Sequence, residues 1–108
     1  MAQERYSYSG AVDADGNLEI TFGPGSRTVQ WVVSQVSVEM TTAPAGATCA
    51  LREGIQLVTP LVPTGDTASG EPAIVLRGGD TLTATWAGCT EGDTGRVYVI
   101  YDESRTLT

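Results

Sequence analysis

Apolar and polar residues alternate along this chain in short stretches, and Gly, Pro, Asp or Asn ends each stretch about every ten residues. Alternation places successive side chains on opposite faces of a strand. No stretch keeps a helical period of about 3.6 residues long enough to predict a helix. The pattern contains about eight strands and predicts an all-β fold, a two-sheet antiparallel sandwich of jelly-roll or related Greek-key type. The 108 residues are expected to form a single domain, 1–108.

The first two alternating stretches, Tyr6–Val12 and Leu18–Phe22, are predicted to pair as a hairpin. The intervening Asp13–Asn17 is rich in Asp, Gly and Asn, which favour turns. Its alternate acids also look like the start of a calcium loop, but Pro24 stands where such a loop needs a bidentate Glu. We therefore favour a turn over a metal site.

The longest apolar run, Thr28–Met40, changes the parity of its apolar positions at Ser34-Gln35. Such a change predicts a β-bulge, or a strand that passes from one sheet to the other. Trp31 in this run and Trp86 further along both follow the inward parity. We expect both indoles in the core, on strands of facing sheets.

Further strands are predicted at Thr48–Glu53, Ile55–Val62, Ala73–Leu76, Thr81–Trp86 and Arg96–Asp102. Because Pro60 cannot donate to a ladder, the second of these should lie at a sheet edge. Pro63–Pro72 is expected to be a polar loop, and Arg77–Asp80 a tight turn of hairpin type.

The charged residues narrow the function classes. Thirteen acids stand against six basic residues, all of them Arg, so the net charge is −7, and there is no His. An acidic surface repels phosphate backbones and anionic membranes, so we expect neither nucleic acid nor membrane as a partner. Without His or Lys, Ser-His-Asp catalysis, His-ligated metal sites and amine nucleophiles are excluded. A carboxylate pair for glycoside hydrolysis is conceivable, but no spacing pairs two acids. The sequence thus predicts a protein that is not an enzyme, with no catalytic residue, cofactor or metal.

Two cysteines, Cys49 and Cys89, are too few for a disulfide scaffold. They are expected to be small, half-buried residues, and a bridge formed after release from the cell is the alternative. Glu91 and Asp93 follow Cys89 and would raise the pKa of its thiol, so an activated thiolate is not expected. Residues after Met1 show no apolar signal segment, which predicts synthesis in a cytoplasm.

Three tyrosines are the candidate partner-binding residues: Tyr6, Tyr8 and Tyr98. A ring with a polar tip suits a protein interface, and a sugar-stacking face is the alternative. The polar N-terminal stretch, residues 1–9, is expected to serve as a docking arm. Residues 103–108 are expected to form a frayed tail.

Longer motifs carry a family resemblance. Ile74–Gly88, with its Leu-Arg-Gly-Gly-Asp turn followed by Leu-Thr-Ala-Thr-Trp-Ala-Gly, resembles a phrase found in small β-sandwich virion proteins of actinobacterial bacteriophages. Leu18–Pro24 and Val29–Val33 are similar to the opening of those proteins, and Gly65–Gly70 falls where they carry a small polar loop. The resemblance spans roughly residues 18–100. Gly78-Gly79 and Cys89 depart from the usual pattern.

The resemblance implies a non-catalytic structural role in the virion. The leading interpretation is a capsid decoration or head-associated subunit, assembled in the host cytoplasm. It would be a homo-oligomer, with a trimer expected, and would bind the phage major capsid or tail protein. The alternative is a tail-tip or fibre module that binds a host cell-surface glycan, which exposed aromatics beside Asp and Asn in one loop cluster would favour. A secreted bacterial β-sandwich module is a third interpretation, disfavoured by the missing signal segment.

Overall fold

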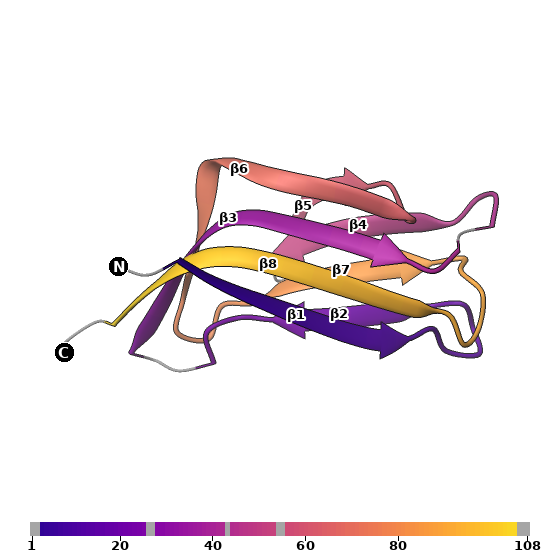
Figure 1. The fold of residues 1–108 in the computed structure, drawn as a ribbon, viewed down its shortest axis with the longest axis horizontal. Helices are drawn as coiled ribbons and strands as arrows, with labels where there is room; N and C mark the ends of the chain where they lie inside the picture. Colours follow the sequence, from indigo (N-terminus) through magenta and orange to yellow (C-terminus); the bar gives the residue numbers. More distant parts are fainter. Residues whose placement is uncertain (1–2, 26–27, 43, 54–55, 106–108) are drawn as a thin grey trace.

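Two four-stranded sheets pack face to face in the computed structural model, which describes residues 3–25, 28–42, 44–53 and 56–105 (Figure 1). The strands are β1 (Gln3–Ala11), β2 (Leu18–Phe22), β3 (Val29–Met40), β4 (Thr48–Glu53), β5 (Gln56–Leu61), β6 (Gly65–Arg77), β7 (Leu82–Ala87) and β8 (Thr94–Arg105). All neighbouring strands are antiparallel. The predicted all-β sandwich is confirmed.

Strand order identifies the topology as a jelly roll. The first sheet has the order β1-β8-β3-β6 and the second sheet the order β2-β7-β4-β5. The first strand therefore pairs with the last, the second with the seventh, the third with the sixth and the fourth with the fifth. This is the pairing of one long antiparallel hairpin rolled up into a double-sheet jelly roll. Every connection except β4–β5 consequently crosses from one sheet to the other.

A single core fills the space between the sheets. Burial alternates along β2 and β7, as the period of two requires for strands with one face in the core. Trp31 on β3 and Trp86 on β7 are both buried, on facing sheets, as predicted. The indole N–H of Trp31 donates to Glu103 Oε1 at 3.1 Å, and that of Trp86 to the Pro63 carbonyl at 3.1 Å. Each ring thus fills the core while its polar atom is satisfied.

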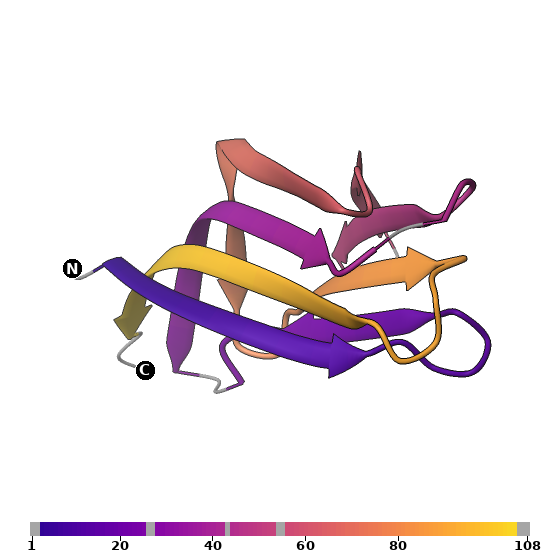
Figure 2. The same ribbon diagram turned by 45° about the vertical axis from the view of Figure 1, so that its right-hand side comes forward.

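The parity change in β3 is a bulge. Its register with both β6 and β8 shifts between Val33 and Gln35. Trp31 and Val33 before the shift, and Val36 after it, all face the core. An extra residue at Ser34 lets one strand keep its apolar side inward, and the strand bends there. Figure 2 shows β3 and β8 curving together toward one end of the sandwich.

The predicted hairpin of Tyr6–Val12 with Leu18–Phe22 is wrong. β1 pairs with β8, and β2 pairs with β7 in the other sheet. Asp13–Asn17 is nevertheless a turn: Asp13 Oδ1 accepts from the N–H groups of Asp15 and Asn17, each at 2.9 Å. The same turn residues serve a connection between sheets as well as a hairpin, so local chemistry did not distinguish the two.

The polar loop predicted at Pro63–Pro72 is also wrong, because β6 runs from Gly65 to Arg77. Its pairing with β3 jumps from Ser69 to Ile74, so the ladder is interrupted there although the strand continues. The tight turn after it is confirmed, with the Asp80 N–H donating to the Arg77 carbonyl at 2.8 Å. That turn joins β6 to β7 across the two sheets and is not a hairpin.

Both chain ends differ from their predictions. Residues 3–9 are not a separate arm, since they form most of β1 and pair with β8 along their whole length. Of the predicted tail, residues 103–105 belong to β8, and residues 106–108 lie outside the described part, as do residues 1–2. Both strands extend further than the sequence pattern indicated, because β8 keeps pairing with β1 and with β3 through polar positions.

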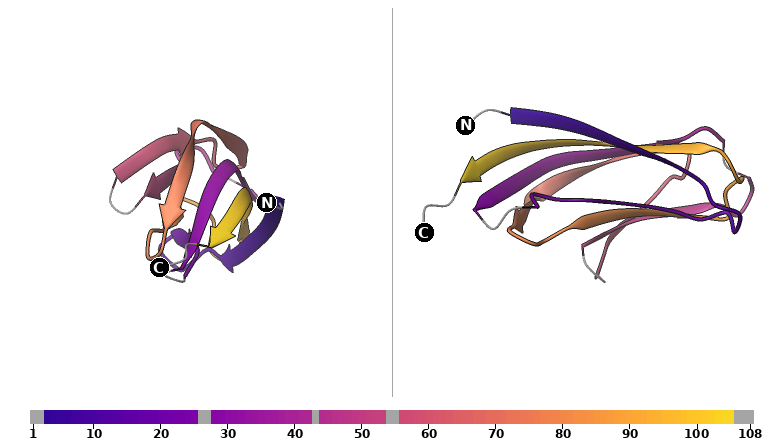
Figure 3. Two further views of the ribbon diagram at one scale, coloured as in Figure 1. Left: turned by 90° about the vertical axis from the view of Figure 1, so that its left-hand side faces the viewer. Right: turned by 90° about the horizontal axis from the view of Figure 1, so that it is seen from below.

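The sandwich is elongated, with principal extents of 47 × 24 × 23 Å (Figure 3). Both termini lie at one end. At the other end, backbone hydrogen bonds tie the β1–β2 and β7–β8 loops together, including Val12 N–H to the Asp93 carbonyl at 2.8 Å and Cys89 N–H to the Gly16 carbonyl at 3.0 Å.

Candidate functional site

The three candidate tyrosines do not form one site. In the β1–β8 register, Tyr6 lies opposite Val99 and Tyr8 opposite Val97, both core residues. Tyr98 lies opposite Ser7 and points away from the core. Tyr6 and Tyr8 therefore stand at the β1 edge of the first sheet, on its inner side, whereas Tyr98 lies on the outer face of that sheet.

At the β1 edge, the rings continue the aromatic core outward. The Tyr8 ring is 5.5 Å from that of Phe22 on β2, so it closes the opening between the two sheets. Tyr6 stacks on buried Tyr101 at 6.1 Å and 8°, and Tyr101 in turn stacks on Trp31 at 3.9 Å. Burial raises the pKa of Tyr8, and Tyr6 adds to this effect. Tyr6, with 56% of its surface exposed, is the ring at this edge that can meet a partner.

On the outer face, Tyr98 is held in place by its hydroxyl, which donates to Glu39 Oε1 at 3.0 Å. Glu39 lies opposite Arg96 in the β3–β8 register. A hydrogen bond with Tyr98, reinforced by the negative charge of Glu39, raises the pKa of Arg96. Tyr98 is thus a fixed aromatic ring that remains 39% exposed.

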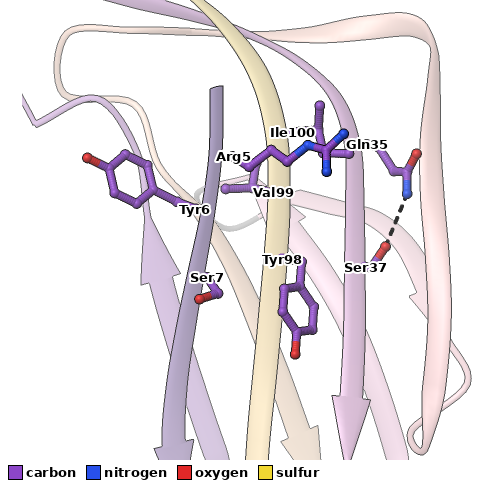
Figure 4. Close-up of a pocket in the computed structure, with 8 residues that line it drawn as sticks. All are labelled: Arg5, Tyr6, Ser7, Gln35, Ser37, Tyr98, Val99 and Ile100. Atoms are coloured by element: carbon purple, nitrogen blue, oxygen red, sulfur yellow. Dashed lines mark hydrogen bonds between the residues drawn. The ribbon is translucent and has the colours of Figure 1, made fainter. Parts of the chain in front are cut away.

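A hollow of about 340 Å³ lies beside this ring on the outer face (Figure 4). Its cause is side-chain size: Ser7 on β1 and Ser37 on β3 flank Tyr98 in register and leave space on both sides. The next cross-strand row supplies Arg5, Ile100 and Gln35. The lining residues are Arg5, Tyr6, Ser7, Gln35, Ser37, Tyr98, Val99 and Ile100.

Hydrogen bonds already engage some of this lining. The Gln35 side-chain amide donates to Ser37 Oγ at 3.3 Å, and Ser37 Oγ is 3.0 Å from Thr67 Oγ1. Within the described residues, by contrast, the Arg5 guanidinium has no ion-pair or hydrogen-bond partner. Its five N–H donors are free to meet a ligand over the hollow.

The outer face of the first sheet is also unusual in charge. Register places Arg5, Arg77 and Arg96 on it, and among its described side chains the acids are Glu39 and Asp102. A chain with net charge −7 thus keeps one face that is not acidic. Sequence reasoning found Tyr98 but missed Arg5 and Gln35, because only the non-local pairing of β1, β8 and β3 brings them together.

A second surface lies on the opposite side of the sandwich, at the β5 edge. Leu57, Val58 and Val62 expose 55%, 39% and 55% of their surface there. We call these three residues the β5 edge. The predicted edge position is confirmed, since β5 is the last strand of the second sheet. Residue 55, the first of the predicted stretch, lies outside the described part.

The thiols are buried and free. Burial, with a smaller contribution from Cys89, raises the pKa of Cys49 to about 12, and burial and Asp93 raise that of Cys89. Neither thiol is poised as a nucleophile at neutral pH. In the part of the chain that is described, no cluster of His, Cys, Asp or Glu is arranged to hold a metal ion. That same part contains no helix long and apolar enough to cross a membrane.

Comparisons with known proteins bear on the fold. No protein-family model matches the chain, and no curated protein sequence does. Among solved structures, the crystal structure of FLHE is similar, with a TM-score of 0.56 and 17% sequence identity over 94% of this chain and 98% of that chain. At this identity the likeness shows a shared fold alone, and it gives no support to a phage origin.

Proposed function

We propose that the protein is a non-enzymatic assembly module of a bacteriophage virion, a capsid decoration or head-associated subunit that works as a homo-oligomer. The observation that carries the proposal is the presence of exposed apolar side chains on both lateral edges of a jelly roll. Tyr6 marks one edge and the β5 edge is the other. Jelly rolls are a frequent architecture of viral capsid domains and of lectins.

The chemistry of the described residues favours assembly over catalysis. The chain has no His, its thiols have raised pKa values, and in the described part of the chain the buried side-chain N and O atoms all have hydrogen-bond partners. Active sites, by contrast, concentrate titratable groups whose pKa is tuned toward the working pH. The proposal of a virion as the place of assembly rests on the sequence motifs of Leu18–Pro24 and Ile74–Gly88, which resemble those of phage virion proteins.

Association at the β5 edge would be driven by side chains. Pro60 has no N–H, and Val58 has no partner in the β4–β5 register, so this edge is poorly suited to accept another strand. The two exposed edges face opposite ways, because β1 lies over β2 and β5 over β6. Contact between the β1 edge of one copy and the β5 edge of the next is heterologous, and such contacts generate rings when the rotation closes. We expect a closed trimer, which matches the local threefold points of an icosahedral shell.

Copy number in the particle tests the proposed function. Purified virions from the host that carries this gene would be analysed by quantitative mass spectrometry, with the major capsid protein as the internal standard. Hundreds of copies per particle are expected for a decoration protein. A handful of copies would instead indicate the tail-tip or fibre alternative, and absence from virions would contradict both.

A further inference from the structure

The hollow beside Tyr98 has the features of a ligand site, and it is separate from the β5 edge. It lies on the outer face of the first sheet, over β1, β8 and β3, and Tyr6 of the β1 edge is among its lining residues. We propose that it binds a saccharide ring that carries a carboxylate, with Tyr98 as the stacking platform and Arg5 as the partner of the carboxylate. This inference goes beyond the proposed structural role.

The part of the hollow over β8 does not offer recognition through backbone pairing. β8 runs beneath it, and both edges of β8 are already paired, with β1 on one side and β3 on the other. An extended peptide that adds to a sheet needs free backbone groups at an edge. A ligand that sits over β8 is therefore recognised by side chains, and it needs polar groups of its own on a compact skeleton.

A sugar ring fits this requirement. Such a ring has an apolar C–H face that can lie against an aromatic ring and a rim of hydroxyl groups that exchange hydrogen bonds with side chains. Tyr98 is exposed and is fixed by its bond to Glu39, so little ordering is needed on binding. Ile100 adds an apolar floor, and Ser7 and Gln35 supply donors and acceptors at the rim. A volume of about 340 Å³ lies at the small end for ligand pockets and suits one or two rings.

Arg5 is the reason for proposing that the sugar carries a carboxylate. Its guanidinium has no partner among the described residues and lines the hollow in Figure 4. A planar guanidinium matches a carboxylate with two parallel hydrogen bonds, and this charge-assisted pair is roughly twice as strong as hydrogen bonds to the neutral hydroxyl groups of a sugar. The net charge of −7 opposes an anionic ligand at long range, but physiological salt screens charges beyond about 8 Å. Arg5 is the arginine that lines the hollow, and the lining contains no acid.

The test is an NMR titration of the isotope-labelled protein with a panel of acidic monosaccharides. The panel contains glucuronate, galacturonate, mannuronate and N-acetylneuraminate, each beside a neutral counterpart such as its methyl ester. At least one acidic probe is expected to shift the amide signals of Ser7, Tyr98 and Ile100, and its neutral counterpart to bind at least tenfold more weakly.

Substitutions test whether Arg5 and Tyr98 form the binding site. Arg5→Gln should weaken binding of that probe about tenfold or more, and Tyr98→Ala should do the same. Tyr98→Phe keeps the ring and should retain most of the affinity. Arg52→Gln is the matched control, because Arg52 is an exposed arginine on β4 in the other sheet. Amide dispersion reports folding of each variant, and the exposed Arg5→Gln substitution is informative even if Tyr98→Ala does not fold.

Three results would overturn the proposal. The first is that no acidic probe in the panel shifts signals around the hollow at millimolar concentration. The second is that the neutral counterparts bind equally well, which would remove the role of the carboxylate. The third is that Arg5→Gln and Arg52→Gln bind alike. None of these results would affect the copy number in virions, so this site and the proposed structural role can fail separately.

Discussion

Gly16 sits in the turn between β1 and β2 with φ of 81°, a conformation that side chains with a Cβ rarely adopt. Its carbonyl accepts the Cys89 N–H at 3.0 Å, and a Cβ at this position would lie 2.8 Å from the Cys89 carbonyl oxygen. The residue therefore fixes the contact between the two loops that close this end of the sandwich.

Gly92 provides a matched comparison for Gly16. Its φ is 87°, but a Cβ there would meet nothing within 4 Å. Gly92→Ala should cost about 1–2 kcal/mol from the left-handed backbone alone. Gly16→Ala should cost more, because the added methyl also clashes with backbone that cannot move freely. Urea unfolding of both variants measures the difference, and equal losses would contradict the described loop contact.

The buried thiol of Cys49 should make the stability of the folded protein depend on pH. Its thiol lies on β4 opposite buried Trp86, and burial raises its pKa from 9.0 to about 12. The unfolded chain releases this proton above about pH 9, whereas the folded protein retains it until about pH 12. The Cys49 contribution to stability is therefore complete below pH 9 and is lost as the pH rises toward 12.

The corresponding variant is Cys49→Ala. Wild-type stability should fall between pH 7 and pH 10, and the fall should be smaller in the variant, which lacks the titrating thiol. The pKa of Tyr101 is also raised, first by its burial and then by Glu103, so a shallower decline should remain. Denaturant unfolding at both pH values gives the slopes, and identical slopes would show that the thiol is not buried.

Among the elements, those with a regular apolar alternation were predictable. The bounds of Leu18–Phe22 and Thr48–Glu53 agree with the sequence pattern, because each presents one clean apolar face to the core. The bulge in β3 was predictable for the same reason: the apolar parity changes where the strand gains a residue. Pro60 marked β5 as an edge through its missing N–H.

Pairing partners were not predictable from local pattern. β1 pairs with β8, at the other end of the chain, and nothing in the turn at Asp13–Asn17 distinguishes a hairpin from a crossing between sheets. The polar first half of β6 has no apolar alternation, so the sequence did not indicate a strand there. β6 lies at the edge of its sheet, and pairing with β3 alone holds this half in place. The hollow depends on the same non-local register, so Tyr98 was visible in the sequence but its neighbours Arg5 and Gln35 were not.

At the scale of the whole molecule, the exposed groups are segregated. One lateral side carries Tyr6, the opposite side carries the β5 edge, and the outer face of the first sheet carries Arg5 and Tyr98. A monomer that worked alone would gain nothing from exposing Leu57 and Val58 on one edge. We therefore regard self-association as the central claim, on which the role in a particle depends.

The molar mass in solution, measured by size-exclusion chromatography with light scattering, tests this claim most directly. The wild-type protein should form a homo-oligomer, with the mass of a trimer. Val58→Asp should shift it to the monomer, because the substitution places a charge in the proposed contact. Val75→Asp is the control, since Val75 is also 39% exposed but lies on the outer face of the first sheet. A monodisperse wild-type monomer at high concentration, or an oligomer that Val58→Asp leaves intact, would contradict the account.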